Sequence, residues 1–351
     1  MNNIITNAGG CQTKDSRKSG TVTLAHGSGG AQTSRLIEDV FKKHLSNEFF
    51  TADDAAVLPG INGRIAMSTD GFIVSPPFFR GGNIGKLSIC GTVNDLACMG
   101  AKPLYMTCSF VIEEGFSLES LETIVTSMAA TAAEAGVKIV AGDTKVAGKG
   151  QVDGVFITTT GIGEIPAGIQ LSGTCAAPGD AIIVTGDIGR HGCCILLERN
   201  DYDIEAEVTS DCAPLSNSVE ALLAAVPETH VIRDATRGGV GTVLYEIASQ
   251  SSTGMYIRSE DVPVSAPVKG VTGLLGLEPL YLACEGTLVV MVPADKTNAA
   301  LEALRSSAHT ENACVIGHVT EDEPGRVIMS TEIGAETYLP RPGNELLPRI
   351  C

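Results

Sequence analysis

Segments typical of strands and of helices alternate along this chain, and that alternation limits the folds it can adopt. Apolar runs typical of strands lie at residues 64–69, 104–112 and 137–141. Between them, apolar residues recur at helical spacing over residues 84–99 and 118–135. A glycine, Gly100 or Gly136, follows each helical stretch, as at many helix ends. This alternation is not an uninterrupted β-α repeat along the whole chain. We therefore predict the α+β class, not the α/β class.

Chain length and a stretch rich in proline, glycine and serine predict two domains. The 351 residues exceed what one hydrophobic core usually spans. Proline, glycine and serine punctuate residues 163–180, so we predict an N-terminal domain at 21–170 and a C-terminal domain at 171–339. The C-terminal domain is expected to be an α+β sandwich, with strands at 181–185 and 287–292 and helices at 192–198, 216–225 and 240–249.

The two ends of the chain lack any periodic pattern. Residues 1–20 are polar and small, and we predict a disordered leader. Residues 340–351 contain three prolines and a glycine, which exclude a helix and predict an extended, flexible tail that ends at Cys351. The eleven residues beyond Pro340 can span at most about 36–40 Å, enough to carry a thiol from a domain surface into a cleft. The cysteine does not form a prenylation box, and an incidental exposed thiol is the alternative.

Composition excludes several classes of partner. The net charge is −17, the 24 lysines and arginines are scattered, and there is no tryptophan, so no nucleic-acid-binding surface is indicated. No apolar run approaches the roughly 18 residues of a membrane span, and no signal peptide is recognised. The eleven cysteines form no Cys-x-x-Cys pair, and we expect the nine from Cys90 to Cys314 to be buried or half-buried thiols. These features predict a cytoplasmic protein with no nucleic-acid or membrane partner.

Acidic residues recur beside small residues in turn contexts, at Asp53, Asp70, Asp95, Asp143 and Asp234. Each could instead cap a turn through its own backbone. Five such positions together favour a magnesium–nucleotide site, because Mg²⁺ binds carboxylate oxygens together with substrate phosphates and water.

Two glycine-rich segments each lead into a helix, which favours phosphate binding. The first, residues 26–30, follows a strand-like run at 22–24, and the second contains Gly238 and Gly239. Glycine lets backbone N–H groups approach a phosphate, and a helix N-terminus stabilises an anion by about 0.3–1 kcal/mol. Neither segment matches the P-loop or the Gly-x-Gly-x-x-Gly dinucleotide motif, so those two classes are disfavoured.

Six motifs in a fixed order carry a family resemblance. They are His-Gly-Ser-Gly-Gly at 26–30, Asp-Asp-Ala-Ala-Val at 53–57, Ser-Thr-Asp-Gly at 68–71, Asn-Asp-Leu-Ala-Cys-Met-Gly-Ala-Lys-Pro at 94–103, Gly-Asp-Thr-Lys-Val at 142–146 and Arg-Asp-Ala-Thr-Arg-Gly-Gly-Val at 233–240. This order resembles the superfamily of aminoimidazole ribonucleotide synthetase, selenophosphate synthetase and thiamine-phosphate kinase, whose members use magnesium–ATP to phosphorylate an oxygen. Within that superfamily, three more segments are similar to the HypE family of hydrogenase-maturation carbamoyl dehydratases. These are Phe-Phe-Arg-Gly-Gly-Asn-Ile-Gly-Lys at 78–86, Ala-Cys-Glu-Gly at 283–286 and Pro-Arg-Ile-Cys at 348–351.

The resemblance, which covers residue 21 to the end, implies a two-domain PurM-like fold whose N-terminal domains pair through their sheets in a homodimer. It also implies ATP and Mg²⁺ as cofactors. The residues it indicates for ATP are His26, Gly27, Ser28, Gly29, Gly30, Asn94, Asp143, Thr144, Gly238 and Gly239. Those it indicates for the metal are Asp53, Asp70, Asp95 and Asp234.

The reaction that the resemblance implies takes place on Cys351. A carbamoyltransferase, HypF, loads a carbamoyl group on the sulfur, and ATP then activates the carboxamide oxygen for elimination. The product is a thiocyanate that supplies cyanide ligands for the iron of [NiFe]-hydrogenase, with the HypC–HypD complex as a further partner. Glu285 and Lys145 match the family's proposed catalytic pair. Burial could raise the pKa of Glu285, but a structural salt bridge is its alternative role, and Lys145 could serve only to hold phosphate.

Two other functions stay open at the level of sequence. Cys11 and Lys14 have a Cys-x-x-Lys spacing similar to the catalytic pair of selenophosphate synthetase, which makes ATP-dependent phosphotransfer of that kind one alternative. We interpret this spacing as accidental, because a polar leader offers no supporting shell for a catalytic pair. The other alternative is a non-catalytic, ATP-gated assembly factor whose tail docks partners.

Overall fold

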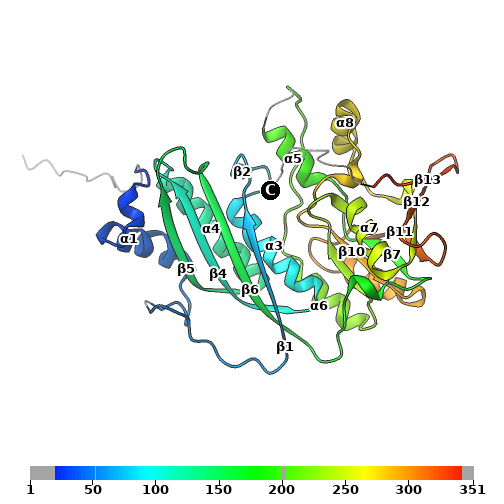
Figure 1. Cartoon of the computed structure of the whole chain (residues 1–351), viewed down its shortest axis with the longest axis horizontal. Coiled ribbons are helices and arrows are strands. Elements are labelled where there is room, and N and C mark those ends of the chain that lie inside the picture. The colour runs from blue at the N-terminus through cyan, green and yellow to red at the C-terminus, as the bar shows by residue number, and fades with distance from the viewer. Residues whose placement is uncertain (1–19, 52, 200–202, 342–351) are drawn as a thin grey trace, which may run out of the picture.

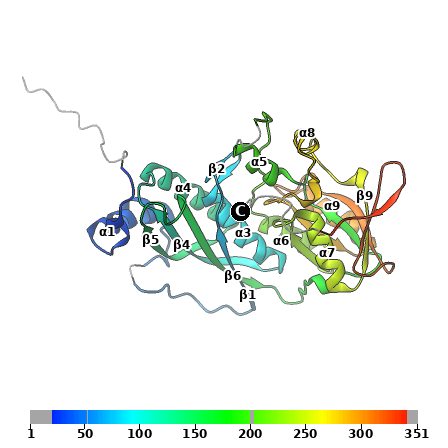
Figure 2. The ribbon, with the colours of Figure 1, turned by 45° about the horizontal axis from the view of Figure 1, so that its top comes forward.

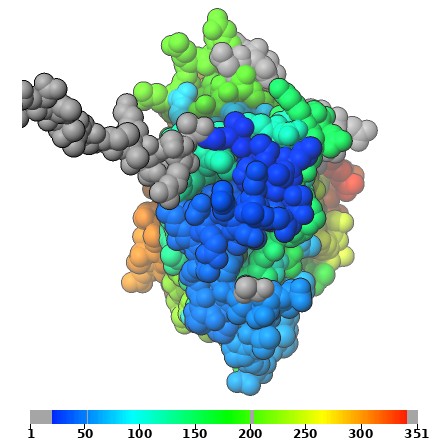
Figure 3. Space-filling model, turned by 90° about the vertical axis from the view of Figure 1, so that its left-hand side faces the viewer, coloured from blue at the N-terminus to red at the C-terminus, as the bar shows by residue number. Residues whose placement is uncertain are grey.

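The computed structural model describes residues 20–51, 53–199 and 203–341, which form two large β-sheets with their helices, arranged side by side, and a small two-stranded sheet (Figures 1 and 2). Viewed from the N-terminal side, the segments that precede the first sheet cover much of that end of the molecule (Figure 3). Cys11, Lys14 and Cys351 lie outside the described residues.

The first sheet has four strands in the order β1-β6-β4-β5, with β4 and β5 parallel and the other neighbours antiparallel. Its strands are β1 (Arg64–Phe72), β4 (Lys102–Glu113), β5 (Lys138–Ala147) and β6 (Val155–Ile165). Helices α3 (Ile84–Cys98) and α4 (Leu118–Ala135) pack on one face, and the short strands β2 (Phe78–Phe79) and β3 (Gly82–Asn83) precede α3. Helix α4 begins at the Ser117 cap and ends at Gly136, whose φ is 70°, as the sequence predicts.

The other face of this sheet is not covered by a helix in the part of the chain that the structure describes (Figure 1). Successive side chains of a strand point to opposite faces, so Ser68 and Asp70 face the helices whereas Ile65 and Met67 face away. Ile65 is 59% exposed and Met67 is 69% exposed. Large apolar side chains on an uncovered sheet face are typical of a surface that a partner covers.

The second sheet has seven strands in the order β13-β12-β9-β11-β7-β10-β8. Its strands are β7 (Ala181–Val184), β8 (Val231–Asp234), β9 (Gly254–Arg258), β10 (Leu288–Val292), β11 (Cys314–Thr320), β12 (Val327–Ser330) and β13 (Glu336–Tyr338). The accompanying helices are α5 (Arg190–Glu198), α6 (Ser216–Ala225), α7 (Gly239–Ser251), α8 (Ala266–Leu275) and α9 (Thr297–Arg305). Both faces of β7 are buried, Ile182 in the core with α7 and Ile183 in the core with α6 and α9, which explains its continuous apolar run.

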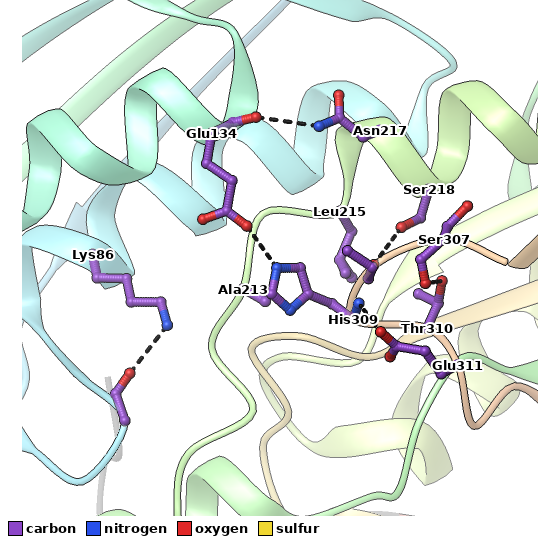
Figure 4. Close-up of polar contacts among 12 residues, drawn as sticks. Lys86, Glu134, Ala213, Leu215, Asn217, Ser218, Ser307, His309, Thr310 and Glu311 are labelled. Carbon is purple, nitrogen blue, oxygen red and sulfur yellow. Dashed lines mark hydrogen bonds and ion pairs between the residues drawn. The ribbon is translucent and has the colours of Figure 1, made fainter. Parts of the chain in front are cut away.

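Helix α3 connects the two halves. It is buried on nearly all sides, because its first part packs on the first sheet and α4 while its last turns contact α6 and β8. The Asn94 side chain crosses the junction, since its amide donates to the Ala213 carbonyl at 3.0 Å and its oxygen accepts from the Leu215 N–H at 2.8 Å. Near the same junction, the Glu134 carboxylate contacts His309 Nε2 at 2.6 Å, and its carbonyl accepts from Asn217 (Figure 4).

Local predictions differ from the structure at three points. Residues 22–24 form no strand, because Leu24 begins a 3-10 helix (Leu24–Gly27) and the Val22 N–H donates to the Phe116 carbonyl. The helical stretch that follows is divided into α1 (Ala31–Leu36), a π-helix (Ile37–Lys42) and α2 (Lys43–Leu45). Cys175 is exposed, whereas the other eight cysteines from Cys90 to Cys314 are buried or half-buried as expected.

The α+β class is confirmed, and the domain boundary near residue 170, between the end of β6 and the start of β7, stays a prediction. Among the described helices, none has the length and apolar character needed to cross a membrane.

Candidate active site

Five carboxylates gather where α3 meets the second sheet, and we call them the acidic cluster: Asp70, Asp95, Asp211, Asp234 and Glu285. They come from β1, from α3, from the segment before α6, from the end of β8 and from the loop before β10. Their proximity is seen in their effects on one another's pKa values. Asp211, Asp234 and Asp70 raise the pKa of Glu285, Asp95 raises that of Asp234, and Asp70 raises that of Asp95. All of them except Asp211 are candidate site residues from the sequence.

Glu285 is the most deeply buried acid of the acidic cluster. Its side chain is buried, and burial followed by the neighbouring Cys212 and Asp211 raises its pKa well above the ordinary value. Within the described residues no ion pair includes Glu285, so the salt bridge considered as its alternative role does not form there. A buried carboxyl whose pKa is raised in this way is a candidate for proton transfer.

Asp211 holds the turn that carries Glu285. Its carboxylate accepts from the Glu285 N–H at 3.2 Å, from the Gly286 N–H at 3.0 Å and from the Thr287 hydroxyl at 3.1 Å. A Cβ at Gly286 would lie 1.8 Å from the Asp211 carbonyl oxygen, so only glycine fits there. Burial raises the pKa of Asp211 although these hydrogen bonds favour its charged form. No motif marks Asp211 in the sequence, because its partners follow 74 to 76 residues later.

Asp70, Asp95 and Asp234 are predicted metal ligands that the fold brings into one neighbourhood. Burial, together with the neighbouring Asp70, raises the pKa of Asp95 to about 6 against an opposing hydrogen bond from Ser68. In the described ranges no three acidic, histidine or cysteine side chains are close enough to hold a metal ion by themselves. The oxygen donors present nevertheless suit Mg²⁺, which completes its coordination with phosphate oxygens and water.

Gly238 and Gly239 adjoin this region. Both have positive φ, 77° and 62°, and they start α7. A Cβ at Gly239 would lie 2.5 Å from the carbonyl oxygens of Leu280 and Leu282, so glycine allows α7 to begin against the segment that leads to Glu285. Asn94, also predicted for ATP, uses its amide in the junction contacts described above.

The remaining nucleotide candidates form a second group, the loop cluster, which consists of residues 26–30 and 143–145. Gly27 lies so close to β5 that a Cβ would be 2.7 Å from the Val146 nitrogen. His26 Nδ1 accepts from the Thr23 N–H at 3.0 Å, and the Ser28 hydroxyl donates to the Ala25 carbonyl at 3.0 Å, so the loop is held by its own polar groups. The loop cluster is therefore a surface feature against the edge strand β5.

Lys145 pairs with Asp143 inside the loop cluster. Lys145 Nζ lies 2.7 Å from Asp143 Oδ2, and this bond lowers the pKa of Asp143. Both side chains are more than half exposed. In β5, residues 143 and 145 alternate with residues that pair with the buried Cys108 and Phe110, so both point to the uncovered face of the sheet.

Within one chain, the acidic cluster and the loop cluster are distant from each other. Across the sheet, Asp70 pairs with Thr159, Thr159 with Cys108 and Cys108 with Gly142, so Asp70 and Asp143 are separated by three strand spacings, about 14 Å. They also point to opposite faces. Lys145 and Glu285 therefore do not contact each other within the described part of one chain. Asp53 is exposed, and no contact joins it to either group in the described structure.

Comparison with known proteins identifies the class first. The model of the AIR synthase related protein N-terminal domain matches residues 52–165, and that of the AIR synthase related protein C-terminal domain matches residues 177–330. The fold is thus the two-domain, PurM-like fold of this class, as the sequence analysis predicts.

Relatives then identify the family. The carbamoyl dehydratase HypE of Azotobacter vinelandii is 46% identical over 335 residues, which cover 95% of this chain and 98% of that protein. A crystal structure of the hydrogenase maturation protein HypE in complex with ATP superimposes with a TM-score of 0.90 at 46% identity, covering 94% of this chain and all of that one. A chain from a HypE–HypF complex gives a TM-score of 0.77 at 45% identity, over 89% of this chain and 100% of that chain. The chain belongs to the HypE family of carbamoyl dehydratases.

This membership confirms the predicted enzyme class. Selenophosphate synthesis and a non-catalytic assembly role were the alternatives, and relatives of 46% identity are carbamoyl dehydratases instead.

Proposed function

We propose that Cys351 carries an S-carboxamide which this enzyme dehydrates to a thiocyanate in an ATP-dependent reaction, as a source of cyanide ligands for the iron of [NiFe]-hydrogenase. The observation that carries the proposal is the buried, unpaired Glu285, whose pKa is raised well above its usual range, in a chain that belongs to a carbamoyl dehydratase family. Such an acid is suited to proton removal in a site that excludes water.

The chemical balance of the dehydration defines what the chain must do. The carboxamide on sulfur loses its oxygen and two protons, and a carbon–nitrogen triple bond forms. Bound ATP supplies the activation that turns the oxygen into a phosphate leaving group. Glu285 takes one of the two protons from the amide nitrogen, and the departing phosphate takes the other. The turn held by Asp211 keeps the Glu285 carboxyl in place for its transfer.

The two residue groups divide the other tasks. In the acidic cluster, Asp70, Asp95 and Asp234 supply oxygen ligands to Mg²⁺, since their mutual repulsion favours a bound cation. In the loop cluster, the glycines of 26–30 bring backbone N–H groups to the ATP phosphates together with Asp143 and Thr144. Lys145 contributes positive charge there. A HypE that crystallised with ATP supports nucleotide binding at this fold.

We propose a homodimer that pairs through the uncovered face of the first sheet. That face carries the exposed Ile65 and Met67 and also Lys145, so pairing buries apolar surface and places the loop cluster of one protomer at the interface. In such a dimer Lys145 would face the partner protomer.

The proposed partners are the carbamoyltransferase HypF, which loads Cys351, and the HypC–HypD complex, which receives the cyanide. The structure of a HypE–HypF complex from a related protein supports the first. A cytoplasmic location is proposed from the many unpaired thiols, which a reducing compartment preserves.

Two cysteine-to-alanine variants test the proposal. The chain is incubated with HypF, carbamoyl phosphate and ATP, and thiocyanate formation is measured for Cys351→Ala and for the control Cys175→Ala, which replaces an exposed cysteine. We expect Cys351→Ala to form none and Cys175→Ala to match the unmodified chain. Undiminished thiocyanate formation by Cys351→Ala would refute the carrier role.

A further inference from the structure

We propose that Tyr245 and Tyr281 form an anchor for the segment that leads to Cys351, and that this tyrosine anchor positions Cys351 for dehydration. The inference rests on the proposed carrier function of Cys351. It assigns a positioning role to two residues that lie outside both the acidic cluster and the loop cluster.

The two hydroxyl groups hold consecutive carbonyls at the end of the described chain. The Tyr245 hydroxyl donates to the Leu339 carbonyl, and the Tyr281 hydroxyl donates to the Pro340 carbonyl. The Leu339 N–H donates to the Val327 carbonyl at 2.9 Å, and its side chain is buried. Leu339 and Pro340 are therefore fixed to the C-terminal domain by both backbone and side-chain groups.

Arg341 extends the same attachment by one residue. Its guanidinium lies 5.5 Å from the centre of the Tyr245 ring, within the range of a cation–π contact. Its Nη2 also reaches the Gly325 carbonyl at 3.4 Å. We call residues 342–351, which end at Cys351, the carrier segment. The three residues just before it, Leu339, Pro340 and Arg341, thus each contact one of the two tyrosines.

The tyrosine anchor is built into the elements that carry candidate site residues. Tyr281 ends the 3-10 helix η5 (Pro279–Tyr281), four residues before Glu285, and Tyr245 lies on α7, which starts at Gly239. Both rings are buried, and a Cβ at Gly241 would lie 2.7 Å from the Tyr281 ring, so the ring packs directly on α7. Tyr281 therefore connects the residues just before the carrier segment with the segment that leads to Glu285.

A fixed start limits where Cys351 can go. The ten residues 342–351 can span at most about 33–36 Å from the tyrosine anchor. Freeing residues 339–341 lengthens the tether, and a longer tether lowers the effective concentration of the thiol at the site. The Tyr281 hydroxyl remains a donor over a wide pH range, because burial raises its pKa to about 12.

The test uses the full-length double variant Tyr245→Phe with Tyr281→Phe, which keeps both rings and removes both hydroxyls. HypF and carbamoyl phosphate load Cys351, and the rate of loading, the dehydration rate at saturating ATP and the KM for ATP are measured separately. We expect dehydration to slow by about 4- to 100-fold, since each of the two lost hydrogen bonds changes an equilibrium by roughly 2- to 10-fold. Loading and the KM for ATP should not change.

Two further variants keep the test decisive. Tyr338→Phe removes the hydroxyl of an exposed tyrosine in β13 and should leave all three parameters unchanged. Arg341→Ala removes the two contacts of an exposed side chain, those with the Tyr245 ring and the Gly325 carbonyl, and should slow dehydration by a smaller factor. Hydrogen exchange of the Leu339 N–H should become faster in the double variant.

The outcomes distinguish the tyrosine anchor from the carrier function. Unchanged dehydration in the double variant, or an equal loss of loading and dehydration, would overturn the tyrosine anchor while leaving Cys351 as carrier. Thiocyanate formation that does not need Cys351 would overturn the proposed function itself. Slower dehydration with unchanged loading and KM for ATP supports the inference.

Discussion

The acidic cluster and the loop cluster contain the same kinds of side chain in opposite surroundings. In the loop cluster, the exposed Asp143 pairs with Lys145, and the pKa of Asp143 is lowered. In the acidic cluster, Glu285 is buried without an ion pair among the described residues, and its pKa is raised. The difference shows that environment, more than residue type, sets the pKa of a carboxylate.

The comparison has a structural cause. The loop cluster lies on an edge strand and an uncovered sheet face, where solvent screens charge. The acidic cluster lies where α3 enters the second half of the molecule, and there packed apolar side chains exclude water. We therefore expect changes in the acidic cluster to alter chemistry and folding strongly, and changes in the loop cluster to alter mainly nucleotide binding.

The largest expected effect is that of Glu285→Gln. The amide has the size of the acid but cannot accept the proton, so ATP-dependent phosphate release by the loaded enzyme should fall by about 10²–10⁴-fold. Nucleotide affinity, measured by calorimetry, should stay the same. Activity within a factor of two of the unmodified chain would show that Glu285 is not the base.

Asp211→Ala should have the next largest effect. It leaves the N–H groups of Glu285 and Gly286 without acceptors, and the free energy of unfolding should fall by about 1–3 kcal/mol in urea titrations. Asp211→Asn retains an acceptor oxygen and should recover part of the loss. Equal stability of the alanine variant and the unmodified chain would mean that Asp211 does not hold the turn.

Ionisation of Asp95 should lower the free energy of unfolding as the pH rises. Its pKa is about 6 when folded and near 3.8 in an ordinary setting, so the folded chain binds its proton more tightly than the unfolded chain does. Between about pH 4 and pH 6, ionising Asp95 destabilises the fold. With a chelator present, Asp95→Asn should stabilise the chain at pH 7 by on the order of 1–2 kcal/mol, and hardly at pH 4. Equal gains at both pH values would contradict this account.

Asp143→Asn should have the smallest effect on stability, with the opposite sign. The lowered pKa of Asp143 adds stability above its ordinary value of 3.8, and that stability is lost as pH falls through the folded pKa. Because the pair with Lys145 is exposed, the loss at pH 7 should stay below about 0.5 kcal/mol. A larger loss in thermal unfolding would show that the loop cluster is structurally coupled to the core.

Much of the fold follows from local sequence signals. The helices at Leu118–Ala135 and Ser216–Ala225 were predicted residue for residue, because their apolar spacing is regular and, in the first, Gly136 ends it. The strand expected at 137–141 instead runs to Ala147, because pairing with β4 extends it through a Gly-Asp-Thr sequence that is typical of a turn. Pairing across the sheet is a tertiary effect that local signals do not contain.

The candidate site could be predicted only in part. An apolar run before Glu285 indicates its burial, and the structure agrees. Asp211 could not be found, because the contacts that define its role join segments far apart in the sequence. The separation of Lys145 from Glu285 was equally hidden, since strand order places β5 at one edge of the sheet and β1 at the other.

The central claim is that the acidic cluster performs the dehydration on Cys351, and the mass of the C-terminal peptide tests it most directly. The unmodified chain and Glu285→Gln are loaded by HypF from carbamoyl phosphate, then given ATP and digested. The account predicts that the peptide ending at Cys351 loses the mass of one water in the unmodified chain and retains the carboxamide in Glu285→Gln. Loss of water in both chains, or in neither, would contradict it.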